Sequence, residues 1–221
     1  MTARVILFDF DGTIADTYQA IADISNQLST EFGYKALNQE ELLLIKNLST
    51  REIVKLSEIS FFKLPFLVRR IRTELSKEIA ELNAIENIDC VLRKLKRQGY
   101  ILGIVTSNNQ ENVDLFLANN QLDRLFSYIY SSTAIFGKHR VIDRAIKNHR
   151  LNRNNVIYVG DETRDIRSAR KSHIRSIAVS WGFNAAGILA KHRPDYLVNR
   201  PSELLDAIAL WQSYSITTTA N

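Results

Sequence analysis

The 221-residue sequence contains little cysteine, little proline and no long apolar run. Its single cysteine, Cys90, cannot form a disulfide within the chain, so we expect a cytoplasmic protein. No apolar run approaches the roughly 18 residues that span a bilayer, which predicts that the protein has no membrane partner. The first apolar stretch covers only residues 5–8 before it meets Asp9, so it does not resemble a signal peptide.

The charge of the chain is moderately basic and unevenly distributed. There are 29 Lys and Arg against 24 Asp and Glu, a net charge of +5, yet residues 16–85 hold nine basic and ten acidic residues. The basic clusters at 93–97 and 164–171 fall on expected helices with aliphatic side chains on the opposite face, which is typical of solvated helix surfaces. The charge therefore predicts no nucleic-acid partner, although it suits anionic ligands.

The apolar pattern changes after the first strand. Residues 4–8 form a nearly continuous apolar run, which is typical of a strand buried on both faces. Over residues 17–83 the apolar side chains recur at helical spacing instead. Pro65 is expected to break this block, with the last helix over residues 67–83. We therefore predict a helical insertion at residues 16–85 that acts as a cap.

Beyond residue 85, helices and strands alternate. Strands are expected at 100–105, 127–130, 156–159, 175–180 and 196–198, and helices at 88–98, 111–119, 138–149, 162–171 and 203–211. Gly99 is expected to end the first of these helices, and residues 213–221 are expected to fray. The alternation predicts an α/β fold, a doubly wound parallel sheet formed by residues 1–15 and 86–221. Ligands of such sheets bind beyond the carboxyl ends of the strands.

Two aspartates, Asp9 and Asp11, directly follow the first strand. Residues two apart on an extended chain point the same way, so the two carboxylates are expected to face one spot. Carboxylates this close repel each other unless a cation lies between them. Mg²⁺ is the expected cation, because it is a hard ion that prefers carboxylate oxygens. The alternative is that the two acids only cap a loop and a helix.

A second acidic pair, Asp161 and Asp165, follows the expected strand at 156–159. If a helix begins near Glu162, the two side chains share one of its faces. Asp161 could then complete the metal site, and Asp165 could orient it or pair with a lysine. The alternative is that both acids only stabilise the N-terminus of the helix.

Polar residues at two further positions suit a phosphate group. Thr106 ends a core strand, and its hydroxyl together with the backbone N–H groups of Ser107 and Asn108 can bind phosphate oxygens. A helix cap formed by Thr106 and Ser107 is a compatible alternative. Lys138 opens a helix, where a lysine is unfavourable for the helix dipole. We therefore expect nearby carboxylates and a phosphate to hold Lys138 there.

These residues form four motifs in a fixed order. They are Asp9-Phe10-Asp11-Gly12-Thr13, Val105-Thr106-Ser107-Asn108, Gly137-Lys138 and Gly160-Asp161-x-x-x-Asp165. Their order resembles that of the haloacid dehalogenase-like (HAD) hydrolases, and most closely the phosphoglycolate phosphatase and β-phosphoglucomutase branch. The resemblance covers residues 4–15 and about 86–205. It implies a Rossmann-like core with an inserted α-helical cap.

The resemblance also implies a role for each core residue. Asp9 would be the nucleophile that forms an aspartyl phosphate, and Asp11 would be the general acid and then the general base. Thr106 and Lys138 would bind the phosphoryl group, and Asp165 would orient the site.

The metal would be held by Asp9, the Asp11 carbonyl and Asp161. The expected protein is a Mg²⁺-dependent phosphatase, a monomer or homodimer that acts on a small phosphorylated metabolite similar to phosphoglycolate.

The cap departs from the family pattern at two places. Residues 83–88 lack the Pro-Gly pair that relatives usually carry, and residues 46–51 lack the glycine often found in the substrate loop. Within that loop, Lys46 and Arg51 are expected to bind a carboxylate of the substrate. The alternative is that both are exposed charges on a helical surface.

Two other functions stay open. A phosphomutase of the β-phosphoglucomutase type would use the same motifs. A phospho-accepting receiver domain also combines aspartates, a threonine and a lysine on a parallel sheet. However, its phosphoacceptor lies on a later strand than the acidic pair, and it has no long helical insertion.

Overall fold

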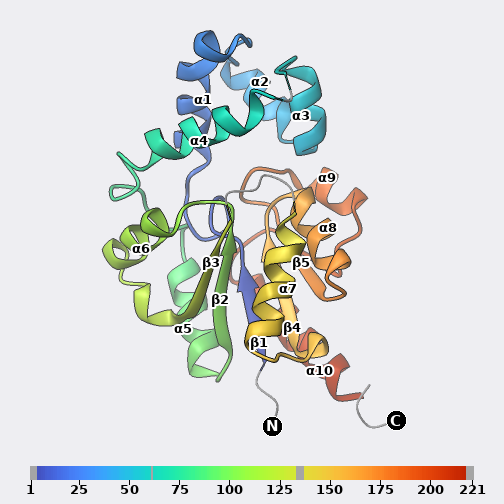
Figure 1. The fold of residues 1–221 in the computed structure, drawn as a ribbon. Coiled ribbons are helices and arrows are strands. Elements are labelled where there is room, and N and C mark those ends of the chain that lie inside the picture. Colours follow the sequence, from blue (N-terminus) through green and yellow to red (C-terminus); the bar gives the residue numbers. More distant parts are fainter. Residues whose placement is uncertain (1–3, 61, 133–136, 218–221) are drawn as a thin grey trace.

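The computed structural model describes residues 4–60, 62–132 and 137–217, and a six-stranded parallel sheet lies at its centre (Figure 1). The strands follow the order β3-β2-β1-β4-β5-β6, so β1 lies in the interior of the sheet. Their bounds are Val5–Phe8 (β1), Ile101–Thr106 (β2), Phe126–Ser131 (β3), Val156–Gly160 (β4), Arg175–Val179 (β5) and Tyr196–Val198 (β6). The sheet confirms the predicted doubly wound α/β fold.

Helices connect successive strands of the core. They are α5 (Ile88–Arg97), α6 (Gln110–Asn119), α7 (Lys138–Asn148), α8 (Thr163–Lys171), α9 (Ala186–Lys191) and α10 (Glu203–Thr217), with 3-10 turns at Asp123–Leu125 and Arg153–Asn155. As expected, α5 ends just before Gly99, whose φ of +85° does not continue a helix. Only glycine adopts that conformation without strain.

The side chains of β1 show why helices cover both faces of the sheet. Ile6 and Phe8 pack with residues of α5, α6 and α10 in one cluster. Val5 and Leu7 point to the other face and pack with residues of α7 and α8. All four side chains are fully buried, and each stabilises the fold by about 1.5–3 kcal/mol. The position of β1, and of the residues that follow it, is therefore tightly fixed.

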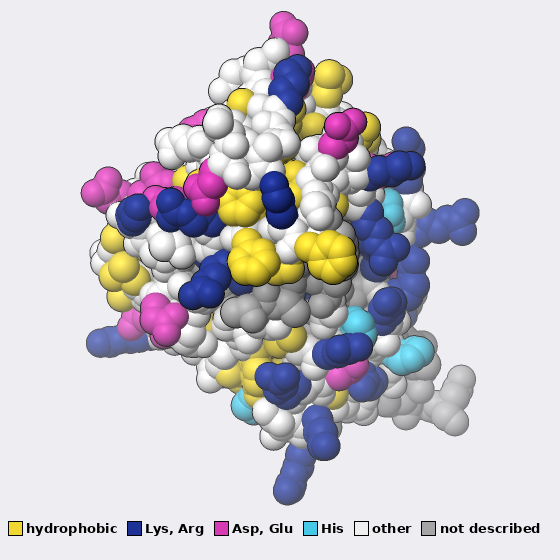
Figure 2. Space-filling view, turned by 45° about the horizontal axis from the view of Figure 1, so that its top comes forward, with side chains coloured by type: hydrophobic (Ala, Val, Ile, Leu, Met, Phe, Trp, Pro, Cys, Tyr) yellow, Lys and Arg dark blue, Asp and Glu magenta, His cyan; other side chains and the backbone are white. Residues whose placement is uncertain are grey.

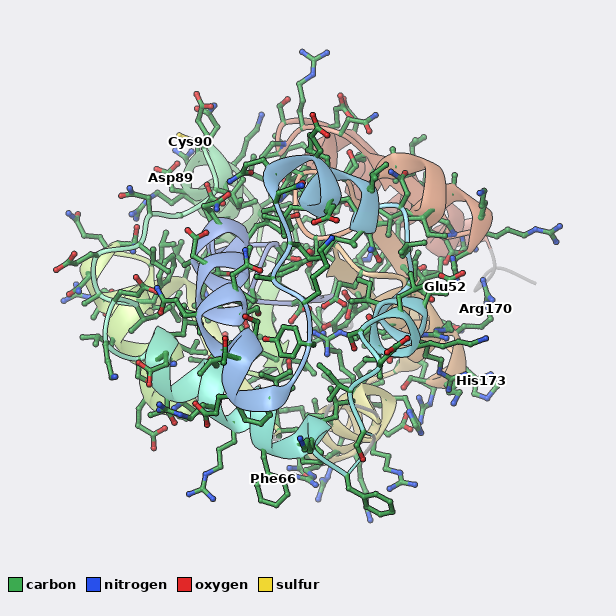
Figure 3. All side chains as sticks on the ribbon, turned by 90° about the horizontal axis from the view of Figure 1, so that it is seen from above. Glu52, Phe66, Asp89, Cys90, Arg170 and His173 are labelled. Carbon is green, nitrogen blue, oxygen red and sulfur yellow. The ribbon has the colours of Figure 1, made fainter. Side chains whose placement is uncertain are left out.

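Four helices lie beyond the carboxyl ends of the strands (Figure 1), and in the view from above they cover that edge of the sheet (Figure 3). They are α1 (Tyr18–Phe32), α2 (Gln39–Ile45), α3 (Thr50–Leu56) and α4 (Leu64–Leu75). We call these helices and their loops the cap. Asn38 and Ser49 begin α2 and α3 with capping boxes, which fixes where these two short helices start.

The two chain segments that join the cap to the core run side by side. The Asp16 N–H donates to the carbonyl of Asn83 at 3.0 Å, and the Ile85 N–H donates to the carbonyl of Ile14 at 2.8 Å. An antiparallel bridge links Ala15 with Ala84 between them. These contacts lie next to the predicted domain boundaries after residues 15 and 85, which stay a prediction.

Two sequence-based expectations on helix bounds were wrong. Instead of breaking a helix, Pro65 lies in the first turn of α4, which begins at Leu64 and ends at Leu75. A proline is tolerated there because its missing N–H would have no partner in the first turn. At the C-terminus, α10 continues through Thr217, beyond its buried Trp211. The rest of the tail that was expected to fray, residues 218–221, lies outside the described residues.

Among the described residues, no helix combines the length and the apolar character needed to cross a bilayer. On the face shown in Figure 2, Lys and Arg side chains are spread over both the cap and the core. That spread is consistent with solvated helix surfaces.

Candidate active site

Asp9 is the first residue beyond β1 and continues its pairing with β4. Its backbone N–H donates to the carbonyl of Val159 at 2.8 Å. Its carboxylate is nearly fully buried, and Oδ1 accepts a hydrogen bond from the Phe10 N–H at 2.8 Å. Burial raises the pKa of the Asp9 carboxyl to about 7, while the nearby Lys138 ammonium acts in the opposite direction. The side chain is therefore held in one orientation beside a fixed cation.

Lys138, the first residue of α7, forms ion pairs with two buried carboxylates. Its ammonium lies 2.5 Å from Asp9 Oδ2 and 2.6 Å from Asp165 Oδ1. Burial alone would lower the pKa of Lys138, but the carboxylates of Asp165 and Asp9 outweigh it, so the pKa is raised. Lys138 therefore stays charged, and the two carboxylates hold it in the first turn of a helix although the helix dipole is unfavourable for a cation there.

Asp11 lies apart from this ion pair and contacts Asn108. The amide of Asn108 donates to both carboxylate oxygens of Asp11, at 3.0 and 3.2 Å. Burial raises the pKa of Asp11, and the hydrogen bond from Asn108 acts against that rise. Asn108 is itself held in place, because its N–H donates to Thr106 Oγ1 at 2.9 Å. A carboxyl group with a raised pKa suits an acid that gives and takes a proton.

The structure does not support the alternative that Thr106 and Ser107 cap the following helix. Helix α6 begins at Gln110, and Asn109 caps it by accepting a hydrogen bond from the Asn112 N–H at 3.1 Å. Thr106 is buried at the end of β2, two residues before that cap. Its hydroxyl thus supports the loop that carries Asn108.

Asp161 lies beyond β4, and two glycines make room for it. Its oxygens accept hydrogen bonds from Thr13 Oγ1 at 2.8 Å and from the Phe183 N–H at 2.7 Å. A Cβ atom on Gly12 or on Gly182 would overlap with the Asp161 carboxylate. Burial raises the pKa of Asp161 well above its usual value, and the neighbouring carboxylates add to that rise. A buried carboxyl among other carboxyls needs a cation to stay ionised.

The acidic groups at this edge fit a hard divalent cation. Among the described residues, carboxylate oxygens of Asp9, Asp161 and Asp165 lie within 4.8 Å of one another, and all three residues are buried. Asp165 is bound by Lys138 and also accepts from the Glu162 N–H at 3.0 Å. Asp9 also pairs with Lys138, so these contacts do not single out one carboxylate, and the metal-binding roles expected for Asp9 and Asp161 stay predictions. The Asp11 carboxylate does not belong to this group.

A cavity of about 240 Å³ lies between the cap and the core, and Asp9, Lys138 and Asp161 are not among the described residues that line it. Asp11, Ser107 and Asn108 line it from the core, and apolar cap residues such as Ile53 and Ile71 line the other side. The predicted acid and the loop after β2 thus face the same space as the cap. A group bound in the cavity would be shielded from water on the cap side.

The two cap residues expected to contact substrate do not line this cavity. Lys46 donates to the carbonyl of Gly182 at 2.9 Å, and its ammonium lies 4.0 Å from the centre of the Tyr18 ring. Arg51 is exposed on α3. Their predicted roles in substrate binding stay predictions.

Several residues of the site escaped the sequence analysis. Asn184 joins the core to the cap: Thr163 N–H donates to its Oδ1 at 2.9 Å, and its Nδ2 donates to the carbonyl of Leu48 at 3.0 Å. Arg72 from α4 and Arg164 from α8 both line the cavity. The expectation that residues 164–171 form a solvated helix surface is thus wrong for Arg164, whose guanidinium pairs with Glu162. Residues from distant segments meet only in the folded chain, so no local motif marks them.

Comparisons with known proteins agree with this geometry. The sequence matches the family described as haloacid dehalogenase-like hydrolase over residues 6–179. It is 32% identical over 205 residues to a phosphoglycolate phosphatase of Synechococcus elongatus, a match that covers 93% of this chain and 97% of that protein. It is 26% identical over 219 residues to the pyrophosphatase PpaX of Bacillus mycoides, covering 95% and 98% of the two chains.

A solved structure shares the fold. The structure of a predicted phosphatase from Clostridium acetobutylicum matches with a TM-score of 0.81 at 22% identity, covering 95% of this chain and 99% of that chain. Together with the match over residues 6–179, these results show that the chain belongs to the haloacid dehalogenase-like hydrolase family. Within that family it is similar to the phosphoglycolate phosphatase branch, as the four motifs indicated.

Proposed function

We propose that this protein is a Mg²⁺-dependent phosphatase that hydrolyses a small phosphate monoester through an aspartyl-phosphate intermediate. The observation that supports it most strongly is the convergence of Asp9, Lys138 and Asp161 at the carboxyl edge of the sheet, next to a cavity that Asp11 lines. In this set, Asp9 supplies the nucleophile, Lys138 a fixed positive charge, Asp161 a metal ligand and Asp11 a proton.

In the first half-reaction, a carboxylate oxygen of Asp9 attacks the phosphorus atom, and the bond to the leaving oxygen breaks. Lys138 and the loop from Thr106 to Asn108 bind the phosphoryl oxygens during this step. A magnesium ion held by Asp9, Asp161 and the Asp11 carbonyl would neutralise charge on those oxygens. Asp11 gives its proton to the departing alkoxide, so the product leaves as a neutral alcohol.

In the second half-reaction, water hydrolyses the aspartyl phosphate. Asp11, now a carboxylate, takes a proton from the water that attacks the phosphorus atom. The bond between phosphorus and the Asp9 oxygen breaks, which releases inorganic phosphate and restores Asp9. Asn108 keeps the Asp11 carboxyl in place through both transfers.

The cavity favours a small substrate. Its volume of about 240 Å³ lies below the roughly 300–1,000 Å³ of typical ligand pockets. A relative at 32% identity is named phosphoglycolate phosphatase, so phosphoglycolate is our first candidate. The expected partner is thus a small phosphorylated metabolite. Family membership also favours a hydrolase over a receiver-like signalling protein.

The release of inorganic phosphate tests this proposal. We expect turnover of 2-phosphoglycolate and of p-nitrophenyl phosphate with Mg²⁺, its loss after chelation, and its recovery when Mg²⁺ is added back. Asp9→Asn should lower turnover by several orders of magnitude, because an amide is a poor nucleophile. Full activity in the chelated enzyme, or in Asp9→Asn, would contradict the proposal. Alcohol release without an equal release of phosphate would favour the phosphomutase alternative.

A further inference from the structure

The cavity under the cap contains a charged side chain that no motif marks. Val68, Ile71, Arg72 and Leu75 all line it, and they follow one another at i, i+3, i+4 and i+7. Residues at this spacing share one face of a helix, so one face of α4 is turned toward the cavity. Three of the four are aliphatic, and Arg72 alone among them is charged. Phe66, in contrast, is exposed and points away from the molecule (Figure 3).

A second guanidinium group, that of Arg164, lies on the core side of the same cavity. It forms an ion pair with Glu162 at 2.5 Å, and Glu162 also accepts a hydrogen bond from Thr50 of the cap at 2.9 Å. Arg164 Nη2 further contacts Ser107 Oγ at 3.5 Å. Arg164 is thus held by Glu162 above the loop that is expected to bind phosphate.

Arg72 lies close enough to Asp11 and Arg164 for their charges to affect it. Burial lowers the pKa of Arg72, the Asp11 carboxylate raises it, and the Arg164 guanidinium lowers it. Arg164 pairs with Glu162, and the Asp11 carboxylate acts on Arg72, so each guanidinium lies near a carboxylate of the site. An anion bound beside the two guanidinium groups would gain charge-assisted hydrogen bonds from them.

The geometry of the proposed reaction defines where such an anion would be. The phosphoryl group is bound at Asp9, and the leaving oxygen is expected next to Asp11. The rest of the leaving group then extends into the cavity, toward Arg72 and away from the metal site. A negative charge located a few bonds from the leaving oxygen would come within reach of the cap.

We propose that Arg72 is the cap residue that determines substrate specificity, by binding a negatively charged group on the leaving side of the substrate. Arg164 adds to the attraction from the core side. This inference rests on the proposed phosphatase function and narrows its substrate class to phosphate esters or anhydrides with an anionic leaving group. The anion could be a carboxylate, as in 2-phosphoglycolate, or a phosphate, as in pyrophosphate.

The placement of Lys46 and Arg51, the two cap cations that were expected to bind substrate, supports this choice. Lys46 is engaged by the Gly182 carbonyl and the Tyr18 ring, and Arg51 is exposed on α3. Neither lines the cavity, whereas Arg72 does.

The test compares Arg72→Ala with Arg69→Ala, a matched control. Arg69 lies on the same helix but is exposed and does not line the cavity. Both variants and the parent are assayed with Mg²⁺ on 2-phosphoglycolate, on its uncharged amide and on pyrophosphate. The acid and the amide have nearly the same shape, so they differ mainly in charge.

We expect Arg72→Ala to lower kcat/KM for the preferred anionic substrate by about 10- to 100-fold, the effect of losing a hydrogen bond to a charged group. Most of the loss should be a rise in KM, and the loss on the amide should be several-fold smaller. Arg72→Lys should recover part of the activity, and Arg69→Ala should match the parent. If kcat/KM of Arg72→Ala falls more for 2-phosphoglycolate than for pyrophosphate, Arg72 binds a carboxylate. If it falls more for pyrophosphate, Arg72 binds a phosphate.

Three outcomes would contradict this inference. Equal losses on the acid, the amide and pyrophosphate would show that Arg72 does not recognise charge. An equal loss in Arg69→Ala would show a general electrostatic effect instead. If the folded parent hydrolyses none of the three, nor p-nitrophenyl phosphate, then the proposed function fails and the inference fails with it. Thermal unfolding of each variant, with Arg72→Gln as a further uncharged replacement, separates these results from misfolding.

Discussion

The Lys138 ammonium lies 2.5 Å from the carboxylate of Asp9, and both side chains are almost completely buried. Each group would be costly to bury alone, and the pair is therefore stable only as a unit. The same contact aligns the proposed nucleophile, since it fixes one oxygen of Asp9 while the Phe10 N–H fixes the other. Stability and catalysis thus depend on the same interaction.

Lys138→Met should impair both properties. Without the ammonium, Asp9 and Asp165 lose their cation, so the pKa of Asp9 rises further and a smaller fraction is ionised. We expect kcat for p-nitrophenyl phosphate to fall by about 10²–10³-fold. Removing one partner of a buried pair should also lower the free energy of unfolding by about 3–5 kcal/mol. Steady-state kinetics and denaturant unfolding measure the two effects.

The control for this variant is Lys147→Met on the same helix. Lys147 is exposed near the end of α7 and should change neither kinetics nor stability by a measurable amount. A Lys138→Met enzyme with parental kcat would contradict the assigned role of the lysine.

Gly182 and Gly187 differ in whether the fold leaves room for a side chain. A Cβ atom at Gly182 would overlap with the Asp161 carboxylate and with the carbonyl of Gly12, whereas a Cβ atom at Gly187 meets nothing within 4 Å. Gly182→Ala should displace Asp161 and weaken Mg²⁺ binding, seen as a rise of at least about tenfold in the Mg²⁺ concentration needed for half-maximal activity.

Gly187→Ala should leave Mg²⁺ binding unchanged and should stabilise the protein slightly. Gly187 is the second residue of α9, where alanine is favoured over glycine by at most about 1 kcal/mol. We expect a small rise in Tm and parental kinetics. If Gly182→Ala bound Mg²⁺ as the parent does, Asp161 would not be the metal ligand that we propose.

The sequence predicted the core of this fold well, because its signals are local. The apolar run at Val5–Phe8 and the later alternation of helices and strands follow from which side chains each element must bury. The end of α5 just before Gly99 was predictable because glycine adopts the positive φ that commonly ends a helix. The bounds of α4 were not, since Pro65 is compatible with both a break and a first helical turn.

The site was only partly predictable. Asp9, Lys138 and Asp161 directly follow or begin core elements, so the fold class alone brings them to one edge. Asn184 could not be predicted, because its role depends on a loop that meets Asp161 and the cap in space. The sequence shows Arg72 only as a charged residue on an otherwise aliphatic helix face. It does not show that this face lines a cavity.

The contact between Asn108 and Asp11 predicts a dependence on the leaving group. Asn108→Ala removes both hydrogen bonds to the Asp11 carboxyl and leaves its orientation free. Proton transfer then becomes harder, which matters most for a poor leaving group such as an alkoxide. We expect kcat for an alkyl phosphate to fall by about 10²-fold, and kcat for p-nitrophenyl phosphate to fall much less. Equal losses on both esters would argue against a role in proton transfer.

The last prediction concerns the attachment of the cap. The buried side chain of Asn184 accepts from the Thr163 N–H at 2.9 Å and donates to the carbonyl of Leu48 at 3.0 Å, so one carboxamide joins the core to the cap. Asn184→Ala leaves both backbone groups without this partner, at a cost of about 1–3 kcal/mol for each buried group. Since the cap encloses the leaving group, we expect KM for the preferred ester to rise several-fold and Tm to fall.

Asn47→Ala is the matched control, because Asn47 lies exposed in the same cap loop, next to Leu48. It should keep the KM and Tm of the parent. Hydrogen exchange of the backbone around Leu48 provides an independent measurement, and it should be faster in Asn184→Ala than in Asn47→Ala. If exchange at Leu48 were equal in the two variants, the contact would not hold the cap against the core, and a change in KM would need another cause.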